Sequence, residues 1–169
     1  MVTPSAWHED AYKYNEPGHD ELQMAVYNWL DNREFGGLRL RDDEESPRLT
    51  RQRVVFEFPM IRAARRGRNG SAEKLVGFVD VAELFGYETD SDFDRAVLFE
   101  IKPEIRTIGG IVRQCLAYQL GFREAFPNKA CKVFAVVPFK DPKLAALRSV
   151  VPCLAWNTET YELEGNRFG

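Results

Sequence analysis

The sequence predicts an α+β fold in which helices flank a mixed central β-sheet. Three strand-like segments follow one another between residues 53 and 102, and adjacent strands of this kind favour an antiparallel meander. An amphipathic helix comes next, followed by the continuous apolar run KVFAVVPF, which is typical of a strand covered on both faces. The order helix, three strands, helix, strand, helix, strand therefore predicts a mixed sheet with helices packed against it.

Helical periodicity marks two long segments and one short one. The first helix is expected at residues 21–33, with Asp20 as its N-cap, and the second at residues 107–126. Their apolar stripes consist of Leu22, Val26, Trp29 and Leu30 in the first helix and Ile111, Cys115, Tyr118 and Phe122 in the second. A short helix is expected over DPKLAALRSV, opened by Asp141 with Pro142 at its first position.

Strands are expected in RVVFEFPMI, KLVGFVDVAEL and AVLFEIK, and a last one in PCLAW. The charged segment at residues 41–51 is interpreted as a loop, and RAARRGRNG as a basic turn. Residues 1–18 are polar and aromatic with two prolines, so they are expected to form an irregular arm. No linker divides the remainder, which predicts one domain at residues 19–169.

Composition narrows the class of protein. With 44% hydrophobic and 29% charged residues the chain is typical of a globular protein. No apolar run approaches the roughly 18 residues of a membrane span, and no secretory signal is visible, so a cytoplasmic protein with no membrane partner is expected. Three scattered cysteines and two histidines argue against a structural zinc or iron–sulfur site. The net charge of −3 argues against coating of nucleic acid by bulk charge, but allows one local basic patch.

Charged residues interrupt strands that should be apolar. Asp80 follows GFV, while Glu100 and Lys102 follow AVLF and, two residues apart, share one face of a strand. A buried carboxylate is costly unless it is paired or binds a cation, and carboxylate oxygens suit Mg²⁺ or Mn²⁺. The alternative is a solvated strand end that carries a Glu–Lys pair, with Asp80 at a bulge or sheet edge.

Taken together, GFVD (residues 77–80), EIK (100–102) and QCLAY (114–118) resemble the motifs G-x-x-D, E-x-K and Q-x-x-x-Y of the PD-(D/E)XK nuclease superfamily, in its RecB-like branch. The resemblance covers residues 20–137. It implies a restriction-endonuclease-like αβββαβ core and a metal-dependent nuclease, with DNA a more probable substrate than RNA. The RecB-like pattern is specific mainly because its three motifs occur in order.

The resemblance also implies roles for individual residues. Asp80 and Glu100 would ligate Mg²⁺ or Mn²⁺ together with the backbone carbonyl of Ile101. Lys102 would orient or help to deprotonate the attacking water. A glutamate from the first helix often joins the metal in this superfamily, and Glu21 is the positional match. A glutamate in a first helical turn is, however, also favoured by the helix dipole alone.

Other polar residues have two interpretations. Gln114 and Tyr118 are four residues apart on one helical face, and the resemblance places such a pair beside the metal. The alternative is that Tyr118 belongs to the core and Gln114 to the solvated surface. Glu57, which also interrupts a strand, is a lesser candidate, and His19 is expected to be a surface residue that flanks the helix.

Basic residues provide candidates for contacts with phosphate, which would position nucleic acid without reading its sequence. They are Arg62, Arg65, Arg66 and Arg68 in the basic turn, and Arg106 and Arg113 near the proposed site. A solvated hairpin is the competing interpretation of the turn. From a different functional class, the alternative to an enzyme is an inactive nuclease-fold module that binds nucleic acid or a protein partner. Whether the chain forms a homo-oligomer is left open by the sequence.

Overall fold

The computed structural model describes residues 18–32, 38–39, 48–63, 73–87 and 92–166. Within these residues seven strands form one sheet, in the same order as in the sequence. The strands are β1 (Leu38–Arg39), β2 (Arg48–Ala63), β3 (Glu73–Tyr87), β4 (Arg95–Ile101), β5 (Ala130–Pro138), β6 (Cys153–Asn157) and β7 (Glu162–Glu164). The predicted irregular arm lies outside the described residues except for Gly18, as does most of the basic turn.

The sheet is mixed, as predicted. Strands β1 to β4 pair antiparallel, β4 pairs parallel with β5, β5 pairs parallel with β6, and β7 returns antiparallel. Strand β4 is therefore the point at which antiparallel pairing changes to parallel pairing. The short strands β1 and β7 were not predicted, because two or three residues carry no readable periodicity.

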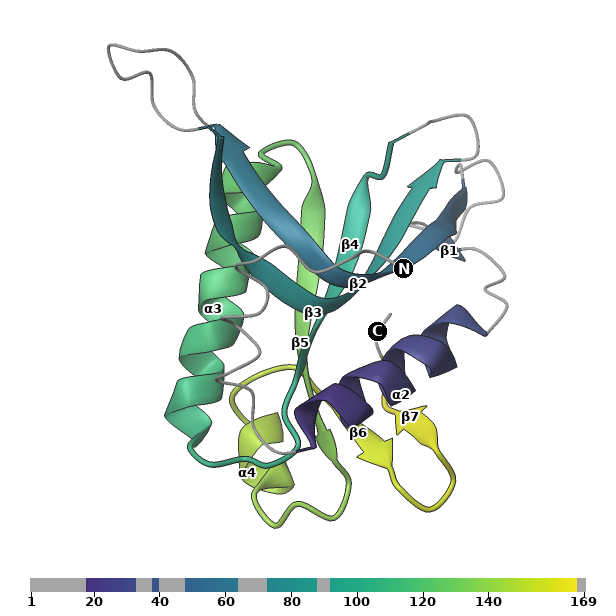
Figure 1. Cartoon of the computed structure of the whole chain (residues 1–169), viewed down its shortest axis with the longest axis vertical. Helices are drawn as coiled ribbons and strands as arrows, with labels where there is room; N and C mark the ends of the chain where they lie inside the picture. The colour runs from purple at the N-terminus through teal and green to yellow at the C-terminus, as the bar shows by residue number, and fades with distance from the viewer. Residues whose placement is uncertain (1–17, 33–37, 40–47, 64–72, 88–91, 167–169) are drawn as a thin grey trace.

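Helices cover both faces of the curled sheet. They are α2 (His19–Asp31), α3 (Ile108–Ala125) and α4 (Leu144–Arg148). Helix α3 lies along one side of the sheet and α2 lies on the other, as Figure 1 shows. None of the helices in the described part of the chain is long and apolar enough to cross a membrane.

Three predicted boundaries are wrong. Helix α2 begins at His19 after Gly18, whose φ of 80° needs a glycine, so Asp20 lies in the first turn and is not the N-cap. Helix α4 begins only at Leu144, after a turn in which the Leu144 N–H donates to the Asp141 carbonyl at 3.1 Å. The loop expected at 41–51 ends earlier, since residues 48–51 belong to β2, where Leu49 is buried opposite Tyr87.

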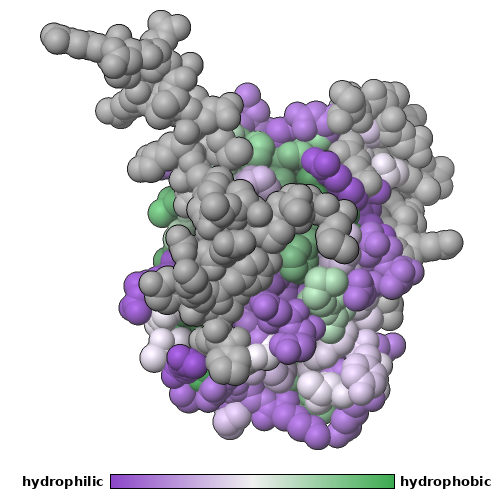
Figure 2. Space-filling model, in the orientation of Figure 1, coloured by the Kyte–Doolittle hydropathy of each residue, from purple (hydrophilic) through white to green (hydrophobic). Residues whose placement is uncertain are grey.

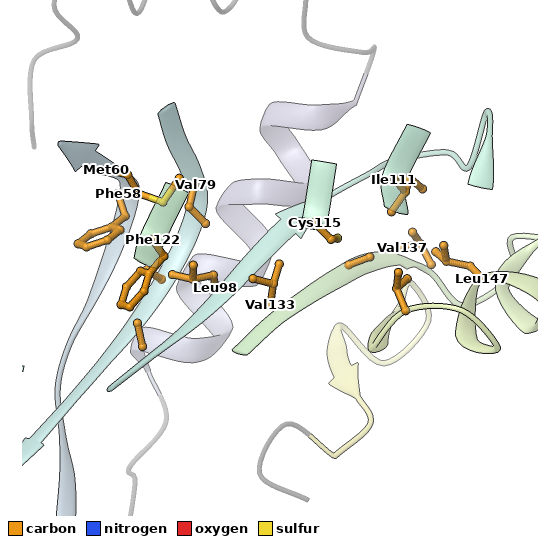
Figure 3. Close-up of a cluster of buried hydrophobic side chains, with 14 of the residues drawn as sticks. Phe58, Met60, Val79, Leu98, Ile111, Cys115, Phe122, Val133, Val137 and Leu147 are labelled. Atoms are coloured by element: carbon orange, nitrogen blue, oxygen red, sulfur yellow. The ribbon is translucent and has the colours of Figure 1, made fainter. Parts of the chain in front are cut away.

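The larger core lies between the sheet and α3. Figure 3 shows its side chains, among them Leu98 from β4, Val133 from β5 and Phe122 from α3. Phe122 is fully buried and lies in a group of aromatic rings with Phe58, Phe93 and Phe126. Burial of this apolar surface fixes α3 against the strands.

The second core lies between the sheet and α2. It receives Val26 and Leu30 from the helix and Val97 and Phe99 from β4. The end of α2 is held by Arg51, whose Nη1 donates to the Leu30 carbonyl at 2.6 Å and lies 3.5 Å from the buried carboxylate of Glu83. On the outer face that Figure 2 shows, the described surface is mostly hydrophilic, with smaller hydrophobic areas between.

Along strands β2 and β3 the alternation of side chains between the two cores is interrupted. Val81 belongs to the α2 core but Val79 to the α3 core, although residues two apart in a regular strand share a face. The same change separates Val54 from Phe58 in β2. Between those two residues Glu57 has a φ of 53°, a left-handed conformation that costs a non-glycine residue about 1–2 kcal/mol. The hairpin thus rolls from one face of the sheet to the other, as its curl in Figure 1 shows.

Replacement of Phe122 with alanine should lower the free energy of unfolding by about 3–5 kcal/mol, because it opens a cavity in the α3 core. Leu120→Ala is the matched control on the same helix. Leu120 is 60% exposed, so its truncation should change stability by only about 0.5 kcal/mol. Urea unfolding of the two variants makes the comparison, and equal losses would show that α3 is not anchored by this core.

Candidate active site

The site begins where β3 leaves β4. The ladder between them runs from Phe85 to Val81 and stops there, opposite Phe99. At the next position the Asp80 carboxylate takes the place of a backbone partner, since its Oδ2 accepts a hydrogen bond of 2.8 Å from the Ile101 N–H. The strands separate at Asp80, and the carboxylate bridges the gap.

Glu100 and Lys102 lie at the end of β4, beside this gap. Glu100 is 1% exposed, and Lys102 Nζ lies 3.1 Å from its Oε1. The backbone continues to pair with β5, because the Lys102 N–H donates to the Val136 carbonyl at 2.9 Å. The α3 core includes Leu98, so alternation turns Glu100 and Lys102 toward α3 as well.

The pKa of Glu100 is unusually high for a carboxylic acid. Burial raises its pKa to about 8, with a further increase from the nearby Asp80 charge. The Lys102 charge and hydrogen bonds from Lys102 and Tyr118 oppose this increase but do not cancel it. Its Oε2 is buried without a hydrogen-bond partner among the described residues. A strongly perturbed carboxyl of this kind is typical of functional sites.

Helix α2 contributes two residues that the sequence analysis did not select. His19 is buried, and its Nε2 lies 3.3 Å from Asp80 Oδ2, so the expectation that it lies on the surface is wrong. Gln23 is 1% exposed, and its Nε2 donates to the Asp80 carbonyl at 2.9 Å. The two residues are four apart, on the face of the apolar stripe, and polar residues on such a stripe are the signal that could have found them.

The pKa of His19 responds to two opposing effects. Burial disfavours the imidazolium, but hydrogen bonding to Asp80 and the charge of that carboxylate outweigh it, so the pKa of His19 is raised. The imidazole is therefore a positively charged partner of the Asp80 carboxylate. Glu21, the predicted contributor from this helix, is exposed. It lies two residues after His19, and two residues of an α-helix rotate the side-chain direction by about 200°. Glu57 lies opposite Asp80 in the hairpin, between the pairs Phe56–Val81 and Phe58–Val79.

Helix α3 brings Gln114 and Tyr118 to the site. Gln114 Nε2 donates to the Tyr118 hydroxyl at 3.3 Å, so the two side chains share a face as expected. Burial and the charges of Glu100 and Asp80 raise the pKa of Tyr118, which keeps its hydroxyl protonated. Tyr118 thus packs against the α3 core and also hydrogen-bonds to Glu100. It is both a core residue and a neighbour of the acidic centre.

Two of the predicted basic residues lie at the start of α3. Arg106 and Arg113 are exposed, and the N-cap of the helix is Thr107, whose side chain accepts from the Gly110 N–H. A Cβ on Gly110 would lie 2.6 Å from the Thr107 hydroxyl, so this cap requires glycine. Arg65, Arg66 and Arg68 lie outside the described residues, and the same holds for the side chain of Arg62. Their roles stay predictions.

A separate groove of about 470 Å³ lies between α2 and the β6–β7 hairpin. It is lined by Asn28, Trp29, Trp156 and Tyr161, among others, and by no carboxylate of the site. Those residues of α2 project from a different side of the helix than His19 and Gln23. The candidate active site is therefore defined by its chemistry and not by this groove.

The acidic centre was assessed as a metal site. In the described part of the chain no three His, Cys, Asp or Glu side chains are already gathered so that they could hold an ion. The buried, unpartnered Oε2 of Glu100 and the neighbouring Asp80 carboxylate nevertheless provide the oxygen donors that Mg²⁺ and Mn²⁺ prefer. The imidazole of His19, at the Asp80 carboxylate, would add a nitrogen donor of the kind that Mn²⁺ accepts. The donor set fits a divalent cation.

Comparisons of the chain with models of known protein families, with characterised proteins and with solved structures found no match.

The raised pKa of Glu100 makes stability depend on pH. Folded protein holds this carboxyl protonated up to about pH 8, whereas the unfolded chain releases the proton near 4.5. The stabilisation is therefore present at low pH and is lost as the pH rises through about 8. In EDTA the free energy of unfolding of the wild type should fall between pH 4.5 and about pH 8. It should fall by more than the free energy of unfolding of Glu100→Gln.

Glu100→Gln also controls for the titration of His19, because the raised pKa of His19 changes stability in the same direction in both proteins. Urea unfolding at a series of fixed pH values measures the difference. Parallel profiles for the two proteins would contradict the high pKa of Glu100.

Proposed function

We propose that the chain is a metal-dependent nuclease that hydrolyses phosphodiester bonds of nucleic acid, with DNA as the expected substrate. The observation that carries the proposal is the contact between the ends of two strands, where the Asp80 carboxylate binds the backbone between Glu100 and Lys102. This brings two carboxylates and an ammonium group together at the position where antiparallel pairing changes to parallel pairing. The sequence resemblance selected the same three residues.

The order of the elements supports the fold that the resemblance implies. Helix α2, strands β2 to β4, helix α3 and strand β5 follow one another as in an αβββαβ core. On this proposal Asp80, Glu100 and the Ile101 carbonyl hold Mg²⁺ or Mn²⁺, with His19 as the contribution of α2. Bound there, the cation would lower the pKa of a coordinated water and neutralise charge on the phosphate.

The residues of the chain then have separate tasks. Lys102 is held beside Glu100 by their 3.1 Å contact, from which its ammonium can orient the attacking water and balance charge on the phosphate. Tyr118 and Gln114 hold the Glu100 side chain from α3. Arg106 and Arg113 are exposed next to the strand end and would contact the phosphates of the substrate.

Asp80→Asn, Glu100→Gln and Lys102→Ala should each reduce Mg²⁺- or Mn²⁺-dependent cleavage by at least about 10³-fold, because the three groups act as one unit. The triple variant should lose little more than a single variant for the same reason. Cleavage of labelled single- and double-stranded DNA, with EDTA as the control, measures this loss. Activity that survives in Asp80→Asn would place the catalytic centre elsewhere.

The same assay tests the inactive-module alternative. A module of that class would bind DNA or RNA equally in Mg²⁺ and EDTA and cleave neither. The presence of Asp80, Glu100 and Lys102 together favours the enzyme, since an inactive module has no use for the Glu100–Lys102 contact at the strand end.

Replacement of Arg106 and Arg113 with alanine should weaken binding of all DNA sequences in EDTA, where no cleavage occurs. The slope of log affinity against log salt should shrink by up to about 0.9 for each lost phosphate contact on duplex DNA. Arg123→Ala is the matched control, because Arg123 is exposed on the same helix about 15 Å further along. An unchanged slope in the double variant would remove α3 from the DNA interface.

A further inference from the structure

Gln23 is a buried polar residue that no motif of the sequence explains. It lies on the core-facing stripe of α2, next to Leu22 and one turn before Val26, and only 1% of its surface is exposed. A leucine or methionine would fill such a position without burying an amide. Its Nε2 donates to the Asp80 carbonyl at 2.9 Å.

The contact fixes which end of the Gln23 amide faces Asp80. A backbone carbonyl can only accept a hydrogen bond, so the NH₂ group must face it and the amide oxygen must point away. That oxygen, Oε1, is buried and has no hydrogen-bond partner among the described residues. Glu100 Oε2 is a second buried oxygen without a partner among these residues, on a carboxyl that interacts with the Asp80 charge.

A water coordinated to a divalent cation would satisfy such unpartnered oxygens. Such a water uses a lone pair on the cation and then offers only hydrogen atoms, so it requires acceptors in its surroundings. Gln23 Oε1 is an acceptor that is already held in place, since the other end of the amide is bound to Asp80.

We propose that Gln23 is a positioning residue of the metal centre. Its NH₂ group holds the backbone of Asp80, and its Oε1 accepts a hydrogen bond from a water of the bound cation. Asp80 is then fixed at two points: by Gln23 at its carbonyl and by the Ile101 N–H at its carboxylate. The proposal rests on the proposed metal-dependent function, and it adds a determinant of metal affinity on α2.

The experiment is a calorimetric titration of Mn²⁺ alone into the full-length protein. Gln23→Met keeps the length and unbranched shape of the side chain but removes both hydrogen bonds. We expect it to bind Mn²⁺ about 10–100-fold more weakly, the effect typical of residues that orient metal ligands. Gln23→Leu, with a different shape, should show the same loss, and circular dichroism checks that both variants are folded.

Val26→Ala is the matched control, because it loosens the same helix through the core without touching the site. It should lower the melting temperature at least as much as Gln23→Met and leave Mn²⁺ affinity unchanged. In cleavage assays the rate of Gln23→Met should recover at saturating Mn²⁺, as expected for a residue that acts on metal affinity.

Each other result is decisive. Wild-type affinity in both Gln23 variants overturns the inference while the proposed function survives. An equal loss in Val26→Ala also overturns it, because the effect would then come from loosening of α2. A wild-type protein that does not bind Mn²⁺ overturns both the inference and the proposed function.

Discussion

The separation of β3 from β4 at Asp80 is the constraint on which the site depends. An antiparallel ladder would satisfy the Ile101 N–H with a carbonyl from β3, and the side chains of Asp80 and Glu100 would then be neighbours along a continuous sheet. The strand instead rolls away at this position, together with Glu57 on β2, and a carboxylate replaces the carbonyl. Because that hydrogen bond satisfies a buried N–H, the open strand end carries no unpaired donor there, and the cost of opening the sheet is reduced.

Charge balance at this point explains the contribution of helix α2. Burial, and after it the Asp80 charge, raises the pKa of Glu100 and disfavours a second negative charge here. Lys102 compensates from the strand itself, and His19 compensates from α2, since Asp80 raises the pKa of its imidazole. A divalent cation would provide the same compensation with a larger charge. A site that holds two carboxyl groups together is therefore suited to bind a divalent cation.

The sequence predicted the elements better than the way in which they bend. Helix α3 and strands β4 and β5 were found close to their observed bounds, because long periodic segments with clear apolar faces identify themselves. The residues that interrupt strands, Asp80 and Glu100, also stood out for that reason. The roll of the hairpin could not be predicted, because neither glycine nor proline marks Glu57 or Asp80. His19 and Gln23 were missed because polar residues are common near the start of a helix, although both lie on its apolar stripe.

The alternation of β4 then decides which helix supplies which part of the site. Val97, Phe99 and Ile101 face the α2 core, so Glu100 must face α3, where Tyr118 can reach it. Helix α2 on the opposite face could not reach the site through an intact sheet. It does so only because β3 departs at Asp80, which exposes the backbone carbonyl and the carboxylate of this residue to Gln23 and His19. The opening in the sheet that exposes Asp80 is therefore also what lets residues from both faces converge on it.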